Sequence, residues 1–246
     1  MDFESRLVKG LDAALKTWSE SPNAFSVARN GGAELAIRSS LLYELECKTG
    51  CIAFTEAGGN RIDIALRKGA ERDGMYLIEL KNNILHKHQQ RYIKSSRDNA
   101  CKQLFPENLN GRKVEGRFYV HLIVGLVDRR DSRKPADSAF LGVWNNILPE
   151  YKRFQCPKDL CSQLKLAKTK LQDLEPRSYR IAAPDEGPAA RAPAHAVLHC
   201  WLVSVNSRAA GNFEAVKGWT PRFVQNPYPD QPQTKPRPRA VPPPKI

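Results

Sequence analysis

Long hydrophobic runs are missing from this sequence. No segment approaches the roughly 20 apolar residues that a transmembrane helix requires, so no membrane partner is expected. The first four residues are acidic at two positions and lack an apolar stretch, which argues against a signal peptide and predicts a cytoplasmic protein. Cysteine is also sparse, with 6 residues in 246, and we expect reduced thiols rather than a disulfide framework.

Acidic residues are in short supply relative to basic ones. The chain has 26 Asp and Glu against 39 Lys and Arg, a formal net charge of +13. A protein this basic usually binds an anionic partner, of which nucleic acid is the commonest, although a basic surface that only aids solubility is the alternative. With 41% hydrophobic residues the chain can bury the core of one α/β domain.

A zinc site is weakly indicated. Its ligands would have to come from Cys156, Cys161, His195, His199 and Cys200. This loose spacing matches no zinc motif, so zinc stays an alternative rather than a prediction.

The hydrophobic pattern predicts alternating helices and strands. A helix over residues 1–20 would bury Leu7, Leu11, Ala14, Leu15 and Trp18, and a second over 33–48 has Leu35, Leu41, Leu42 and Leu45 on its apolar side. Three strands are then expected, over residues 51–55, 61–66 and 75–81, followed by a basic helix over 88–105 and a strand over 117–126. A helix over 155–178, a loop over 182–193 and a late strand over 197–205 are expected after them.

These elements suggest four regions. They are an N-terminal helical segment over residues 1–32 and a core over 33–150. A C-terminal extension packing on the core follows over 151–225, and the chain ends in an extended, basic, Pro-rich tail over 226–246. The core has the order α-β-β-β-α-β and predicts an α/β fold.

Three charged residues stand out on the second and third strands. Because side chains alternate across a strand, Ile62, Ile64 and Leu66 are expected on one face and Asp63 on the other. On the third strand Glu79 and Lys81 share the face opposite Tyr76, Ile78 and Leu80. A hairpin would bring the three charged groups together.

This set suits phosphodiester hydrolysis. Two carboxylates can hold Mg²⁺ through oxygen, the metal acidifies a bound water, and a lysine can hold that water in place. The alternative is an exposed charged face with cross-strand ion pairs, each worth about 0.2–1 kcal/mol.

Asp63 followed by Ile78-Glu79-Leu80-Lys81 resembles the signature of the PD-(D/E)XK nuclease superfamily. The resemblance covers about residues 33–126 and implies a restriction-endonuclease-like core, a mixed central sheet flanked by helices. It also implies that Asp63, Glu79 and the Leu80 carbonyl bind Mg²⁺, with Mn²⁺ as a substitute, and that Lys81 acts on the attacking water. One departure is Asn60-Arg61, where a proline often precedes the aspartate.

Two more site residues follow from the same resemblance. Many members add a glutamate from the first core helix, and Glu34 in Glu34-x3-Arg38-x2-Leu41 is similar to the helix start of archaeal Holliday-junction resolvases; Glu44 and Glu46 are rivals. Gln103 is similar to a glutamine often found on the helix after the lysine strand, with a plain surface glutamine as the alternative.

The basic helix is the predicted nucleic-acid contact. Its candidates are Lys87, Arg91, Lys94, Arg97 and Lys102, which could follow a phosphate backbone or form a merely solvated face. We therefore expect a Mg²⁺-dependent endonuclease, with DNA favoured over RNA, in restriction, phage defence or repair. The alternatives are a non-cleaving nucleic-acid-binding module and a basic interaction protein that uses its Pro-rich tail; a homodimer and a protein partner for the tail stay open.

Overall fold

A computed structural model shows an α/β architecture. The structure describes residues 2–29, 31–57, 62–67, 74–84, 89–106, 113–127, 174, 176–182, 195–208, 213–220 and 222–224. Within these residues, no helix combines the length and the apolarity needed to cross a bilayer.

Four helices are seen in the described part of the chain: α1 (Phe3–Ser19), α2 (Ala24–Arg29), α3 (Ala33–Thr49) and α4 (Gln89–Leu104). The first begins where the Asp2 carboxylate accepts the Ser5 N–H at 2.8 Å, a side-chain cap for an otherwise unpaired amide. The third ends at Gly50, whose φ of 66° lies in the left-handed region that glycine reaches without a steric penalty.

The described strands form one mixed, open sheet. They are β1 (Ile52–Ala57), β2 (Ile62–Arg67), β3 (Met75–Ile84), β4 (Val114–Val127), β5 (Arg177–Ala182), β6 (His195–Val205), β7 (Phe213–Ala215) and β8 (Arg222–Val224). The order across the sheet is β1-β2-β3-β4-β6-β5-β8, and β7 pairs with the end of β6. The β3–β4 and β5–β8 pairs are parallel and the other pairs are antiparallel.

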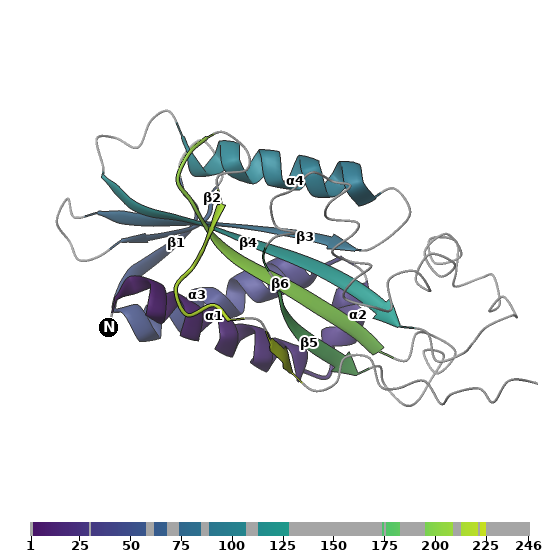
Figure 1. The fold of residues 1–246 in the computed structure, drawn as a ribbon. Coiled ribbons are helices and arrows are strands. Elements are labelled where there is room, and N and C mark those ends of the chain that lie inside the picture. The colour runs from purple at the N-terminus through teal and green to yellow at the C-terminus, as the bar shows by residue number, and fades with distance from the viewer. Residues whose placement is uncertain are drawn as a thin grey trace, which may run out of the picture.

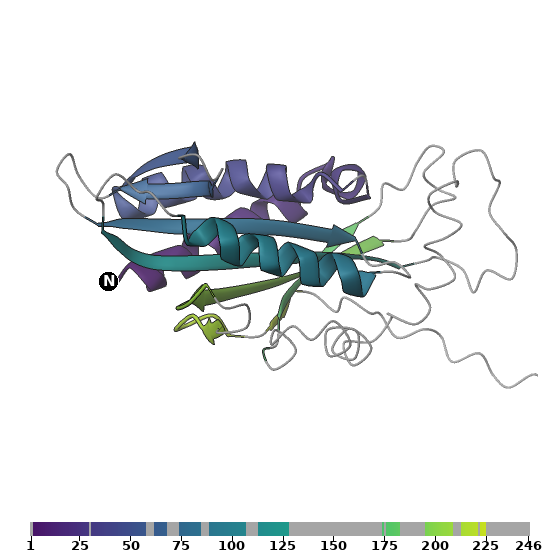
Figure 2. The same ribbon diagram turned by 90° about the horizontal axis from the view of Figure 1, so that it is seen from above.

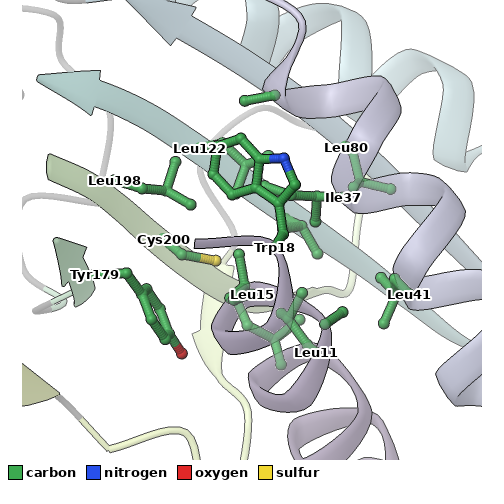
Figure 3. Packing of buried hydrophobic residues seen from close by; sticks show 14 of the residues in the cluster. Leu11, Leu15, Trp18, Ile37, Leu41, Leu80, Leu122, Tyr179, Leu198 and Cys200 are labelled. Atoms are coloured by element: carbon green, nitrogen blue, oxygen red, sulfur yellow. The ribbon is translucent and has the colours of Figure 1, made fainter. Parts of the chain in front are cut away.

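Helices cover both faces of the sheet. Figures 1 and 2 show α1, α2 and α3 on one face and α4 on the other, above β3 and β4. The larger apolar core lies on the α1–α3 face, where Leu11, Leu15 and Trp18 of α1 meet Leu122 of β4 and Leu198 of β6 (Figure 3). A second apolar cluster lies under α4 and includes Ile93, Leu104 and Trp201.

The predicted core elements are confirmed. From α3 to β4 the chain has the order α-β-β-β-α-β, with element ends within a few residues of those expected from the sequence. The predicted buried stripe of α1 is confirmed at Leu7, Leu11, Ala14, Leu15 and Trp18. Hydrophobic spacing was sufficient for α1 because its apolar residues recur on one side of the helix.

Two predictions of which side chains share a buried face were wrong. Leu35 is 60% exposed on α3, and the buried stripe instead follows four-residue spacing through Ala33, Ile37, Leu41 and Leu45. Ile62 packs in the α4-side cluster, whereas Ile64 and Leu66 pack in the α1–α3 core. Regular alternation therefore breaks between Ile62 and Ile64.

The C-terminal part differs more from the expectation. Strand β5 begins at Arg177, so a helix extending to residue 178 was wrong at its end, and Ala182 belongs to that strand rather than to a loop. The late strand is confirmed as β6, which pairs along β4 and so continues the same sheet. Helix α2 and strands β7 and β8 were not predicted. Most of the region expected to be helical from 155, and the tail from 226, lie outside the described residues.

Candidate functional site

The site forms where β2 leaves β3. Their pairing runs from Arg67↔Met75 to Ile64↔Ile78 and stops, while β3 continues to Ile84 beside β4. The last six residues of β3 therefore pair with β4 on one side and have no partner strand among the described residues on the other. Backbone groups on this open edge need other hydrogen-bond partners because buried amides are rarely left unpaired.

Carboxylates accept hydrogen bonds from two amides of this edge and from one amide of β2. The Leu80 N–H donates to Asp63 Oδ2 at 2.8 Å, and the Asp63 N–H donates to Glu79 Oε2 at 3.1 Å. Two residues further along, the Asn82 N–H donates to Glu34 Oε2 at 2.8 Å. Side chains from α3, β2 and β3 thus converge on one stretch of strand.

This geometry also places the Leu80 carbonyl. In a strand the N–H and C=O of one residue face the same edge, so the Leu80 carbonyl faces the edge that Asp63 and Glu34 reach. The residues predicted as oxygen donors are therefore together at the open edge of β3.

Two cationic side chains contact the cluster. The Lys81 ammonium is in direct contact with Glu79 Oε1 and lies 3.9 Å from Asp63 Oδ2. On the α3 side, Arg38 Nη1 lies 3.0 Å from Asp63 Oδ1. The two oxygens of Asp63 therefore have different cationic neighbours, a lysine and an arginine.

Asp63 and Glu79 are buried, and Glu34 is half-buried. Glu79 is fully buried, and burial raises its pKa to about 7, with the charge of Asp63 adding to the rise and Lys81 opposing it. Burial also raises the pKa of Glu34, against the opposing charge of Lys81. With every group ionised, the three carboxylates and the two cationic side chains carry one net negative charge. A buried cluster of this kind attracts a cation.

The donor chemistry fits a hard divalent ion. Carboxylate and carbonyl oxygens are the ligands that Mg²⁺ prefers. Within the described residues, however, no three His, Cys, Asp or Glu side chains are already arranged as a metal-binding group. Asp63 Oδ2 and Glu34 Oε2 accept backbone amides that are two residues apart, so an ion at these oxygens would compete with those contacts.

The neighbouring strand carries two buried polar residues that were given no role from the sequence. Tyr119 is in register with Glu79, and His121 is in register with Lys81. A hydrogen bond joins the Tyr119 hydroxyl to His121 Nδ1, and burial lowers the pKa of His121 to about 3, so its ring is neutral. His121 Nε2 is buried and has no hydrogen-bond partner among the described residues. The signal in the sequence is two polar residues, two apart, within the otherwise apolar stretch 118–127.

The predicted nucleic-acid residues do not share one environment. Lys94 and Lys102 are exposed on α4. Arg97 is buried and its guanidinium lies 2.6 Å from Asp98, so its assignment to a solvent-facing patch was wrong. Lys87 and the side chain of Arg91 lie outside the described residues. Helical spacing alone did not reveal which basic residues face inward.

Gln103 lies in the last turn of α4 and is half-buried. The part of α4 beside the end of β3 is earlier in the helix, since Asn83 Nδ2 donates to Ser96 Oγ at 3.3 Å. The hydrogen bonds and ion pairs described above that link Asp63, Glu79, Lys81 and Glu34 do not include Gln103. Its predicted role in the site stays a prediction.

Of the alternative zinc ligands, the two whose side chains are described do not share a face of the sheet. His199 and Cys200 are consecutive on β6, so their side chains point to opposite faces, and Cys200 packs in the α1–α3 core. Cys156, Cys161 and the side chain of His195 lie outside the described residues. Among the described residues, Cys47, Cys51, Cys101 and Cys200 form no disulfide.

Comparison of the chain with models of protein families, with curated proteins and with solved structures found no match.

Proposed function

We propose that this protein is a metal-dependent nuclease of the PD-(D/E)XK superfamily that hydrolyses phosphodiester bonds, with DNA as the favoured substrate. One observation carries the proposal: the Lys81 ammonium lies against the carboxylates of both Glu79 and Asp63, the three residues of the signature. Asp63 on β2 is 16 positions from Glu79 on β3, and Lys81 is 2 positions from Glu79. Asp63 therefore meets the other two residues only because the two strands pair in the fold. Restriction, phage defence and repair are the settings in which such an activity would be used.

The topology supports a restriction-endonuclease-like core. The sheet order β1-β2-β3-β4 has an antiparallel meander followed, after α4, by a strand parallel to β3. The helix before the meander carries Glu34, whose Oε2 accepts the Asn82 N–H near the signature residues, and this supports its proposed role. The finer family assignment rests on this order and on the signature residues.

The residues have distinct proposed roles. Asp63, Glu79 and the Leu80 carbonyl would hold Mg²⁺ or Mn²⁺, with Glu34 as a further oxygen donor. When bound, the ion supplies an acidified water and neutralises charge on the phosphate. Lys81 would orient that water and stabilise the developing negative charge.

Charge also supports the proposal. A divalent cation would change the net charge of the cluster from one negative to one positive, and a phosphodiester would return it to zero. The cation therefore leaves the cluster with one excess positive charge, and a phosphodiester would neutralise it.

The test is an incubation of purified protein with supercoiled plasmid, linear duplex, single-stranded DNA and RNA, with and without Mg²⁺ or Mn²⁺. Cleavage that requires the ion and is abolished in Asp63→Asn and Glu79→Gln is expected. Glu214→Gln, on the exposed strand β7, is the matched control and should cleave normally. Ion-independent cleavage, or full activity in both site variants, would contradict the proposal.

A non-cleaving nucleic-acid-binding domain is the second candidate. It is favoured by the engagement of Asp63, Glu79 and Glu34 with cationic side chains or backbone amides and by the lack of a preformed metal-binding group in the described residues. Calorimetric titration with Mg²⁺ separates the two: binding of DNA without binding of Mg²⁺ would favour this candidate.

A further inference from the structure

Arg38 occupies a position that the roles above leave unexplained. It lies on α3 one turn after Glu34, and its Nη1 is 3.0 Å from Asp63 Oδ1. The side chain is 18% exposed, so the guanidinium sits at the boundary between the buried acids and solvent. Lys81 approaches the other Asp63 oxygen, so each oxygen of this carboxylate has its own cation.

We propose that Arg38 is a phosphate-binding residue, whose ion pair with Asp63 is exchanged for the substrate phosphodiester when a divalent cation takes Asp63. The inference rests on the proposed function, because it requires a cation at Asp63 and a phosphodiester substrate.

The exchange follows from competition for one group. A divalent cation and a guanidinium cannot share the Asp63 carboxylate closely without repelling each other, since both are positive. Displacement of Arg38 from Asp63 leaves a partly exposed cation beside a site that has become net positive. A phosphodiester is the anion that restores neutrality, and the planar fork of N–H donors on arginine matches two phosphate oxygens.

The proposal predicts opposite changes for the two ligands. Without Arg38, the cluster of Glu34, Asp63, Glu79 and Lys81 carries two net negative charges instead of one, so a cation should bind more tightly. The phosphodiester loses a donor and should bind more weakly. A purely structural Arg38, one that only braces Asp63, predicts that its removal weakens cation binding because the carboxylate loses its orientation.

The experiment uses Arg38→Gln and Arg38→Lys in the full chain. Arg208→Gln is the matched control, because it removes the same charge from an exposed residue just after β6. Ca²⁺ affinity is measured by calorimetry, and binding of a labelled DNA duplex is measured in Ca²⁺ and in EDTA. Single-stranded DNA and RNA form parallel arms. Circular dichroism establishes that each variant is folded.

In Arg38→Gln, Ca²⁺ affinity should rise by roughly tenfold because a nearby like charge is removed. Affinity for DNA in Ca²⁺ should fall about 10- to 100-fold, the scale of removing one charge-assisted hydrogen-bonding group. The deficit relative to Arg208→Gln should shrink in EDTA, where Arg38 is held by Asp63. Arg38→Lys keeps the charge, so its Ca²⁺ affinity should match the wild type while its DNA affinity is intermediate.

A fall in Ca²⁺ affinity in Arg38→Gln, or a DNA affinity equal to that of Arg208→Gln, would overturn the inference while leaving the nuclease proposal intact. If Arg38→Gln does not fold, Arg38→Lys decides the matter: DNA binding in Ca²⁺ equal to wild type would overturn the role of the guanidinium fork. Failure of the wild-type protein to bind Ca²⁺ at all would instead contradict the proposed function, and the inference with it.

Discussion

The two faces of the sheet differ in what they bury. On the α1–α3 face the buried side chains are almost all apolar, and the main charged exception is Arg177, whose Nη1 lies 3.1 Å from Asp12. The opposite face buries polar groups along successive strands, namely Glu79, Tyr119, His121, His199 and Ser178. Ser178 Oγ lies 2.8 Å from His199 Nδ1, so the polar residues continue to β5.

The difference indicates that the two faces contribute unequally to stability and to function. Burying apolar side chains stabilises a fold, whereas burying polar ones costs free energy even when each finds a partner. The α1–α3 face therefore supplies most of the stability. The other face, together with the open edge of β3, carries groups that a core alone does not need, as functional sites commonly do.

The largest effect on stability is expected from the α1–α3 face. Leu11 is fully buried in α1, and Leu11→Ala should lower the free energy of unfolding by about 2–5 kcal/mol through reduced burial and a residual cavity. Leu35→Ala, at a 60% exposed position of α3, should change it by no more than about 0.5 kcal/mol. Urea denaturation measures both, and equal decreases would contradict the assignment of these faces.

On the polar side the largest effect should be on chemistry. Lys81→Ala removes the ammonium from Glu79 and Asp63 and should slow single-turnover cleavage at least ~10²-fold, with little change in DNA binding in Ca²⁺. Lys48→Ala is the matched control, since Lys48 pairs with Glu44 on the surface of α3. A variant that loses affinity but keeps its rate would make Lys81 part of the basic surface only.

Stability should also fall on acidification because of the polar face. Burial lowers the pKa of His121 and of His199 to about 3, below the usual 6.5. The unfolded chain therefore takes up protons first, and the stability present above pH 6.5 is lost as the pH falls, by about 1.4 kcal/mol per pH unit for each histidine.

Glu79 acts in the opposite direction. Its pKa is raised to about 7 by burial, so its contribution is present below the unfolded value of 4.5 and is lost as the pH rises through 7. Glu79→Gln removes this opposing contribution and should steepen the loss of stability between about pH 7 and about pH 5. Urea denaturation across this range measures the slope, and a slope no steeper than that of the wild type would contradict the pKa assignment.

The smallest effect concerns surface charge. Replacing the exposed Lys94 and Lys102 of α4 with Gln should reduce the slope of log affinity against log salt, by about 0.9 for each duplex phosphate that is no longer neutralised by a lysine. Replacing the exposed Lys9 and Lys16 of α1 should leave the slope unchanged. Equal changes of this slope for the two pairs of substitutions would contradict a nucleic-acid contact on α4.

Much of this arrangement follows from local pattern. Alternation along two strands joined by a hairpin was enough to predict that Asp63, Glu79 and Lys81 would meet, and the structure brings them together. Alternation failed at Ile62, since β2 diverges from β3 there and an irregular strand does not keep a two-residue period.

Other features depend on distant parts of the chain. Arg38 and Asp63 are 25 residues apart on different elements, so their contact depends on how α3 docks. Arg97 could be taken for a surface residue because a helical pattern shows which residues share a side and not whether that side meets a sheet. Strand β5 was missed because it has few residues and is stabilised by pairing with β6, which comes later in the chain.

Hydrogen exchange of two backbone amides at the open edge of β3 would report on the state of the site. The amides of Leu80 and Asn82 donate to carboxylates, while those of Glu79 and Lys81 face the paired strand β4. Hydrogen exchange at the first pair is therefore governed by the motion of Asp63 and Glu34, and at the second by opening of the sheet. A cation that draws the two carboxylates away would accelerate exchange at two alternate residues and leave the other pair protected.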